Sequence, residues 1–324
     1  MKRILVTGAC GQIGSELTTT LRDRYGRENV IATDIRMPAN EQLRDGGPFE
    51  FLDCVDPHHI TRVMQIHGVD TIFHLAAILS AVGEAKPNQA WQVNMVGLYN
   101  MLEAARQYHC ALFVPSSIGA FGPSTPKEKT PQDTVQRPTT MYGVTKVAGE
   151  LLCDYYNRRF RTDTRGVRFP GLISYETEPG GGTTDYAVEI FFEALRHKRY
   201  TCYLREDSSL DMMYMPDAIS AMIDLMEADP ARLVHRNAFN VTAFSFTPAQ
   251  IAEEICKHIP DFTIDYKVDP VRQEIADSWP DSLDDSAARE EWDWKPRYSF
   301  EAMVEEMLQR IAQRLERPAE QKIR

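Results

Sequence analysis

The chain has 324 residues, of which 43% are hydrophobic and 26% charged, a composition typical of globular enzymes and not of disordered or fibrous proteins. Its formal net charge is -11, and no block of Lys and Arg offsets it, so we do not expect nucleic acid as a partner. No apolar run approaches the about 18 residues that a membrane-spanning helix needs, so no membrane association is expected either.

The N-terminal segment and the cysteines favour a cytoplasmic protein. The chain starts directly on an apparent strand, at Met1 to Val6, without the apolar core of a secretion signal before it. Six cysteines are dispersed without a C-x-x-C pair or metal-ligand spacing, which is typical of buried thiols in a reducing compartment. We therefore expect no structural metal and a cytoplasmic location.

Short β-branched runs alternate with longer helical patterns through the first half of the chain. The expected strands are 4–7, 30–34, 71–75, 112–116 and 164–168, and the expected helices are 13–25, 60–67, 87–108 and 142–160. This alternation predicts βαβ units and hence an α/β fold with a doubly wound parallel sheet of the Rossmann type.

The regular alternation of predicted strands and helices ends after Pro170. Three glycines at 180–182 precede a helix that should start near Thr184, and an amphipathic helix is expected from Phe300 to about Leu315. We therefore predict a Rossmann domain over residues 1–170. Residues 171–324 are expected to form mainly a smaller α/β lobe that binds substrate, with some segments returning to the first domain.

A glycine array follows the first predicted strand and opens the first predicted helix. It contains Gly8, Gly11 and Gly14, with Gln12 and Ile13 between the last two. Glycine allows the tight turn and the close approach of a diphosphate to the main chain, and the helix N-terminus then offers N–H groups to the phosphates. In this strand–turn–helix context the array predicts a nicotinamide dinucleotide site rather than a simple turn.

Asp34 ends the second predicted strand, twenty residues after Gly14. A carboxylate there accepts hydrogen bonds from ribose hydroxyls and repels the extra phosphate of NADP, so NAD is the expected cofactor. Arg36 could weaken this preference by pairing with a phosphate, or could be a solvated loop charge. Asp53 is a candidate partner of the adenine amine, whereas Asp56, before Pro57, is expected to cap a helix.

Tyr142 and Lys146 lie four residues apart at the start of a predicted helix, and therefore on one face of it. A nearby ammonium favours the phenolate that a tyrosine base needs, and the same lysine can hold the nicotinamide ribose. Ser116 and Ser117 end a predicted strand at the sheet edge where ligands bind. We expect Ser117 to hydrogen-bond the reacting oxygen and Ser116 to contact the cofactor, with a turn or cap role as the alternative.

At these residues the chain resembles the extended short-chain dehydrogenase/reductase family, from Met1 to about Leu308. Within that family, four strings are similar to the NAD-dependent L-threonine 3-dehydrogenases. They are VPSSIGAFG at 114–122, PGGGTTDYA at 179–187, MMYMPD at 212–217, and SWP at 278–280 with LDDS at 283–286.

The resemblance implies roles for further residues. Tyr142 is the implied base, Lys146 its electrostatic partner and Ser117 the hydroxyl donor in the oxidation of L-threonine to 2-amino-3-oxobutanoate, a step of threonine catabolism. Further implied cofactor contacts are Leu75, Ala76, Ala77, Asn94, Phe169 and Leu172, and the implied substrate contacts include Ser80, Thr183, Thr184 and Trp279. The glycine turn at 180–182 could supply N–H groups to the amino-acid carboxylate, or could act as a hinge.

Two other functions compete with this interpretation. A nucleotide-sugar epimerase or dehydratase shares the scaffold, but typically carries an Arg-rich string where this chain has Leu210 to Tyr214. A dehydratase also needs acidic residues where Ile118 and Gly119 follow Ser117. A non-catalytic dinucleotide sensor would have no need of Ser117, Tyr142 and Lys146 together.

The family also implies an assembly. The helices 87–108 and 142–160 correspond to the pair through which relatives form homodimers. Apolar residues on these helices are consistent with a second buried face, or with packing on the sheet: Trp91, Leu98, Leu102, Leu151 and Tyr155.

Overall fold

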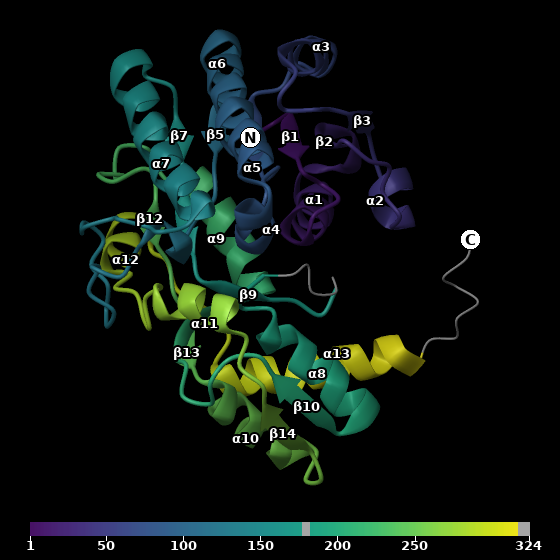
Figure 1. The fold of residues 1–324 in the computed structure, drawn as a ribbon. Coiled ribbons are helices and arrows are strands. Elements are labelled where there is room, and N and C mark those ends of the chain that lie inside the picture. Colours follow the sequence, from purple (N-terminus) through teal and green to yellow (C-terminus); the bar gives the residue numbers. More distant parts are fainter. Residues whose placement is uncertain (177–181, 317–324) are drawn as a thin grey trace.

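The computed structural model describes residues 1–176 and 182–316, whose arrangement is drawn in Figure 1. The first half alternates strands and helices as the sequence predicts. Its strands are β1 (Ile4–Thr7), β2 (Val30–Asp34), β3 (Phe49–Phe51), β4 (Thr71–His74), β5 (Ala111–Phe113), β6 (Ser116–Ser117), β7 (Thr164–Arg165) and β8 (Val167–Phe169). Its helices are α1 (Gln12–Tyr25), α2 (Glu41–Asp45), α3 (Pro57–His67), α4 (Ser80–Ala85), α5 (Pro87–Trp91), α6 (Leu98–Tyr108) and α7 (Met141–Phe160), with 3-10 turns at Arg27–Asn29 and Ile118–Ala120.

The main sheet has six parallel strands in the order β3-β2-β1-β4-β5-β7. The order runs outward from β1 in one direction and from β4 in the other, so the predicted α/β class with a doubly wound sheet is confirmed. In such sheets ligands bind outside the carboxyl ends of the strands, at the point where the order reverses. That point lies between β1 and β4.

Helices cover both faces of this sheet because its strands alternate their side chains between two apolar layers. In β1, Ile4 and Val6 pack in one layer with α1 and with α9 (Met215–Glu227). Leu5 packs in the other layer with α3, α6 and α7. The strand β1 is therefore buried on both faces.

Two predicted strands are broken in the structure. The run 112–116 stops pairing in the main sheet after Phe113 and resumes as β6, and the run 164–168 is interrupted at Gly166. Pro115 has no N–H to continue a ladder, and a Cβ on Gly166 would lie 2.2 Å from the Val114 oxygen. Beyond these breaks β6 and β8 pair with each other, so Ser116 and Ser117 project past the edge of the main sheet.

The predicted helix 87–108 contains a wider turn. A π-helical segment, Gln92–Gly97, joins α5 to α6. Such turns are common near functional sites because they rotate the side chains that follow. Asn94 lies in this segment, buried and directed toward α7 through a hydrogen bond to Thr145 Oγ1 at 3.2 Å.

The second half forms a lobe that lies below the first in the view of Figure 1. Its strands are β9 (Gly171–Ile173), β10 (Arg199–Cys202), β11 (Leu210–Tyr214), β12 (Phe239–Asn240), β13 (Phe244–Phe246) and β14 (Thr263–Tyr266). Its remaining helices are α8 (Tyr186–His197), α10 (Pro248–His258), α11 (Pro270–Asp277), α12 (Ser286–Trp292) and α13 (Phe300–Glu316). A separate apolar core joins α8, α10 and α13 to the sheet β13-β11-β9 and to the pair β10-β14.

Some segments after residue 170 belong to the first lobe by packing. The helix α9 lies against the main sheet beside α1, and β12 pairs with β8. The boundary at residue 170 and the assignment of substrate binding to the second lobe remain predictions.

Within 1–176 and 182–316 no helix is long and apolar enough to cross a bilayer. Over the same ranges no cluster of three or more His, Cys, Asp and Glu side chains is arranged to hold a metal ion. The six cysteines are free thiols.

Candidate active site

The turn between β1 and α1 is built so closely that two of its glycines cannot carry a side chain. Gly8 has φ 68°, and a Cβ there would lie 2.7 Å from the Ala76 nitrogen. A Cβ on Gly14 would lie 2.2 Å from the Gly8 oxygen. The turn therefore exposes main chain to a ligand and brings the N-terminus of α1 to the same place, as a bound diphosphate requires.

Asp34 lies at the end of β2, beside this turn. Its Oδ2 accepts a hydrogen bond from the Cys10 N–H at 2.9 Å, and its Oδ1 lies 3.8 Å from the Arg36 Nε. Arg36 also donates to the Cys10 carbonyl at 3.2 Å, so its exposed guanidinium extends across the turn. The carboxylate is in position for a ribose hydroxyl.

Two carboxylates after β3 differ in their contacts. Asp53 is exposed, and its Oδ1 accepts from the Val55 N–H at 2.9 Å, which is a local turn contact. The predicted adenine contact of Asp53 stays a prediction. Asp56 caps α3 by accepting from the His58 N–H at 2.8 Å, with Pro57 in the first turn, as predicted.

The residues predicted to transfer the proton converge from two elements. Tyr142 and Lys146 lie on the first turns of α7, which Thr140 caps by accepting from the Gly143 N–H at 3.0 Å. The Lys146 Nζ donates to the Pro115 oxygen at 2.6 Å and lies 5.3 Å from the centroid of the Tyr142 ring. Ser117, at the end of β6, accepts from the Gly119 N–H at 3.1 Å.

A glycine also sets the position of the Tyr142 ring. A Cβ on Gly119 would lie 3.0 Å from Tyr142 Cε1, so the ring packs directly on the main chain after Ser117. The hydroxyl of Ser117 and the phenol of Tyr142 therefore border one cleft.

A buried histidine lies beneath Lys146. His74 ends β4, and its Nδ1 is 2.8 Å from the Thr7 hydroxyl. Burial, and to a lesser extent the Lys146 ammonium, lower the pKa of His74 to about 3. The imidazole is thus neutral and adds no charge to the site.

Most predicted contacts meet in the cleft between the two lobes. The predicted residues that line it are Gln12, Ile13, Leu75, Ala77, Ser80, Ser116, Ser117, Tyr142, Lys146, Phe169, Leu172, Thr183, Thr184 and Trp279. Gly180 and Gly181 of the predicted glycine turn lie outside the described residues.

Other predicted residues surround this cleft without lining it. Gly8, Gly11, Gly14 and Asp34 form the cradle. Ala76 and Asn94 border a small pocket of about 30 Å³ beside Lys146, large enough for a water molecule. The Asn94 amide donates to the Ile78 oxygen at 3.0 Å and accepts from its N–H at 2.7 Å, so Asn94 fastens the loop before α4.

The cleft also contains Gly182 of the predicted glycine turn, together with residues for which no individual contact was predicted: Leu79, Pro115, Ile118, Pro170, Gly171 and Asp185. Gly171 is the informative one, since a Cβ there would lie 2.8 Å from Thr184 Cγ2. Its position between Phe169 and Leu172, two predicted cofactor contacts, was the available signal. Asp185 accepts from the Gly182 N–H at 2.7 Å and so shapes the turn before Thr183.

The doubly wound sheet, the glycine cradle with the Asp34 carboxylate beside it and the Ser–Tyr–Lys group are typical of an enzyme that uses a nicotinamide dinucleotide. Residues 4–242 match the NAD dependent epimerase/dehydratase family, and the chain belongs to that family. NAD is its cofactor, and the cradle geometry fits it.

Known proteins resemble the chain over nearly its whole length. An uncharacterized epimerase/dehydratase of Staphylococcus haemolyticus is 57% identical and covers 97% of this chain and 99% of its own. The crystal structure of L-threonine dehydrogenase from Clostridium difficile is 58% identical with a TM-score of 0.95, covering 97% and 98% of the two chains. A monomeric L-threonine 3-dehydrogenase from a metagenome is 44% identical with a TM-score of 0.92, covering 97% and 100%.

Proposed function

We propose that this chain oxidises the β-hydroxyl of L-threonine to 2-amino-3-oxobutanoate, with Tyr142 as the base. The observation that carries this proposal is a single cleft that Tyr142, Lys146 and Ser117 share with Thr183 and Trp279. The similarity to the Clostridium difficile L-threonine dehydrogenase supports the choice of substrate.

The cradle residues would hold the cofactor. The main chain from Gly8 to Gly14 and the N-terminus of α1 would bind the diphosphate, and Asp34 would bind the adenosine ribose. NAD, when bound, supplies the acceptor for the hydride that leaves the substrate carbon. Lys146 would hold the nicotinamide ribose from the floor of the cleft.

The proton is moved by the chain's own side chains. Tyr142 takes the proton of the substrate hydroxyl, and the Lys146 ammonium stabilises the phenolate that is needed to do so. Because Ser117 Oγ accepts from the Gly119 N–H, its own hydrogen remains available for the reacting oxygen. Ser117 thereby steadies the oxygen while the proton leaves.

Thr183 is the strongest candidate for holding the amino acid. It is 1% exposed, and among the described residues its Oγ1 has no hydrogen-bond partner, although it lines the cleft. An unsatisfied buried hydroxyl is costly, and a polar ligand atom would relieve that cost. Ser80 and Thr184 would add polar contacts, and the Trp279 ring would form an apolar wall.

The main competing function is that of a nucleotide-sugar epimerase or dehydratase, the name carried by the Staphylococcus haemolyticus relative. A second diphosphate in the cleft would need basic side chains. At the start of β11 this chain has Leu210, which is 1% exposed and packed in the core of the second lobe. The sequence after Ser117 is Ile118-Gly119, which offers no acid for dehydration.

We further propose that the enzyme acts in threonine catabolism in the cytoplasm, as a homodimer. The free thiols support a reducing compartment. Residues 1–170 would bind NAD, and most of residues 171–324 would form the substrate-binding lobe.

The test is NADH formation with L-threonine, beside D-threonine, L-serine and UDP-glucose, for the wild type and Tyr142→Phe. We expect activity with L-threonine, and a loss of about 10²–10⁴-fold in kcat in the variant with NADH binding retained. Absence of activity with L-threonine in a wild type that binds NADH would overturn the substrate assignment. Full activity of Tyr142→Phe would overturn the assignment of the base.

A further inference from the structure

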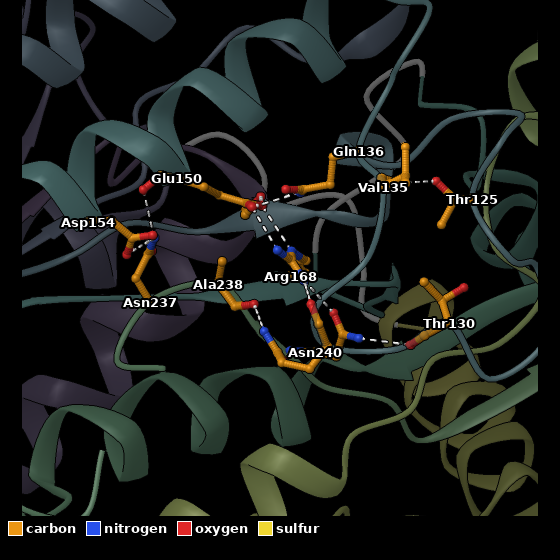
Figure 2. Close-up of polar contacts among 12 residues, drawn as sticks. Thr125, Thr130, Val135, Gln136, Glu150, Asp154, Arg168, Asn237, Ala238 and Asn240 are labelled. Carbon is orange, nitrogen blue, oxygen red and sulfur yellow. Dashed lines mark hydrogen bonds and ion pairs between the residues drawn. The ribbon is translucent and has the colours of Figure 1, made fainter. Parts of the chain in front are cut away.

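A buried ion pair beside the proposed site is not used in the mechanism above. Glu150 lies on α7, one turn beyond Lys146, and Arg168 lies on β8; both side chains are almost fully buried. The Arg168 Nη2 and Nε lie 2.9 Å and 3.1 Å from Oε2 and Oε1 of Glu150, so the pair is held by two parallel bonds (Figure 2). This fork geometry fixes the orientation of both groups.

On one side, the pair holds the strand end that carries the serines. Ser116 donates to the Glu150 carboxylate, and Gln136 donates to it at 2.8 Å. The strand β6 is only two residues long, so it has few ladder bonds of its own. Its neighbour Pro115 accepts the bond from Lys146, and Ser117 borders Tyr142. A shift of the Glu150 carboxylate would therefore displace the contacts of the whole proton-transfer group.

On the other side, Arg168 reaches toward the second lobe. Its Nη1 donates to Asn240 Oδ1 at 3.1 Å, and the Asn240 amide donates to the Thr130 oxygen at 3.0 Å (Figure 2). The same amide donates to the Asp284 oxygen at 3.2 Å. Thr130 in turn donates from its N–H to the Ser282 oxygen at 2.9 Å. The segment held in this way, 282–284, closely follows Trp279.

Stability alone is a weak explanation for this arrangement. Removing two charges from water costs several kcal/mol, and buried ion pairs can often be replaced by apolar side chains without loss of stability. An apolar pair, however, could not bind both the Ser116 hydroxyl of β6 and the Asn240 side chain, through which the 282–284 segment is held. What the charges add is a defined geometry between the two walls of the cleft.

We propose that Glu150 and Arg168 are positioning residues, which set the Ser116–Ser117 strand end against Tyr142 and Lys146 and, through Asn240, set the loop that carries Trp279. The expected changes in kcat and KM rest on the proposed function, whereas the expected change in NADH binding does not. The contacts of Glu150 with β6 form the first arm of the proposal, and the contacts of Arg168 through Asn240 form the second. Each arm predicts a different kinetic effect.

Glu150→Gln tests the first arm. The amide keeps the shape but loses the charge-assisted bonds, so the strand end moves relative to Tyr142. Since misplacement by about 1 Å can cost about 100-fold, we expect kcat to fall about tenfold or more with KM for threonine little changed. NADH binding, measured by its fluorescence, should weaken several-fold, because Ser116 and Lys146 border the cofactor.

Asn240→Ala tests the second arm. It removes the side-chain link from Arg168 to Thr130 and Asp284, while the Arg168 bond to the Gln132 oxygen at 2.8 Å remains. We expect a several-fold higher KM for threonine with kcat and NADH binding little changed. The matched control is Arg165→Lys. Arg165 is as deeply buried as Arg168 and lies three residues before it, but it binds the Leu225 and Ala228 oxygens at 2.7 Å and 2.8 Å, at the end of α9. This control should lower the melting temperature without changing kcat, KM or NADH binding.

The outcomes separate the two claims. If the wild type binds NADH but does not oxidise threonine, the proposed function fails, and weaker NADH binding in Glu150→Gln alone would still support the positioning role. If Glu150→Gln does not fold, Arg168→Lys is used instead. This variant keeps the positive charge but loses the two parallel hydrogen bonds to Glu150, and the same results are expected. The proposal is overturned if kcat and KM change together in all variants in proportion to lost stability, as a purely structural role requires.

Discussion

At the scale of single residues, the cofactor-binding turn depends on glycines, because the space that a Cβ would occupy there is filled by neighbouring main-chain atoms. Gly14 is the clearest case, since the space where its Cβ would lie is taken by the Gly8 oxygen at 2.2 Å. Glycine costs conformational entropy inside a helix, so its presence in α1 is explained by close packing on the turn and not by helix propensity.

Gly14→Ala should therefore weaken cofactor binding. The added methyl must push α1 away from the turn at an overpacking cost of about 1–3 kcal/mol, and the main-chain groups that face the diphosphate move with it. We expect NADH to bind about tenfold more weakly, as measured by fluorescence titration. Gly83→Ala is the control, because a Cβ there meets its nearest neighbour at an ordinary 3.7 Å. Equal NADH affinity in both variants would contradict the close-packing argument.

Glu16 predicts a pH dependence of stability. It lies on α1, where its carboxylate accepts from the Ser174 hydroxyl at 2.5 Å. Burial raises its pKa from 4.5 to about 7, with Glu176 adding to the increase and the Ser174 bond opposing it. The folded state therefore binds this proton more tightly than the unfolded chain does.

The sign follows from that difference. The stabilising contribution of protonated Glu16 is complete below the ordinary pKa of 4.5, decreases as the pH rises, and is lost above about 7. Its size is at most about 3 kcal/mol. Glu16→Gln should remove this component, so its free energy of unfolding should fall less than that of the wild type between about pH 5 and pH 8. Parallel pH profiles in denaturant titrations of the two proteins would exclude the effect.

At the scale of elements, α7 carries the proposed chemistry and its first turn is held by one cap. Thr140→Ala removes the bond to the Gly143 N–H, which should cost about 1 kcal/mol of stability. Because Tyr142 lies in that turn, kcat should fall as well. Thr247→Ala removes the equivalent cap of α10, far from the cleft, and should lose similar stability with kcat unchanged. Equal kcat in the two variants would show that the cap does not position Tyr142.

The elements that the sequence predicted well are those with a strong local signal. The strands β1, β2 and β4 are apolar runs buried on both faces, and α1 and α7 begin at recognisable turn or cap residues. The cradle and the Tyr142–Lys146 spacing are local too, so their positions could be predicted.

What the sequence did not reveal depends on distant contacts. The break of two strands at Pro115 and Gly166 became visible only once β6 and β8 were seen to pair. The partnership of Glu150 with Arg168 joins a helix to a strand through that same pairing, and neither residue stands out by periodicity. Two-residue strands are too short to leave a pattern of period two.

At the scale of the whole molecule, one face is unusually apolar. The helices α6 and α7 lie side by side on the outside of the first lobe (Figure 1). Leu98 and Leu102, for which packing on the sheet was the alternative to a place on this face, pack into the core beneath it. Trp91, Leu151 and Tyr155 remain 46%, 63% and 53% exposed, and Tyr99 beside them is 50% exposed.

This face is where we predict that two copies meet. Exposed apolar residues gathered on α5, α6 and α7 are costly in a monomer, and a twofold contact would bury the same helices of both copies. A stable dimer needs roughly 1,200 Å² or more of buried surface, which two helix pairs can supply. We therefore expect the wild type to sediment as a dimer at micromolar concentration.

Leu151→Arg places a charge in the middle of this contact and should yield a folded monomer, because an unpaired charge cannot be buried there without a large cost. Val234→Arg is the control, since Val234 is 82% exposed on a loop that packs against α12 and should leave the dimer intact. A wild type that sediments as a monomer, like the metagenome relative described as monomeric, would contradict the prediction.

Dimerisation through this face would also support α7 from its outer side, so the Leu151→Arg monomer should have a lower kcat, whereas Val234→Arg should not.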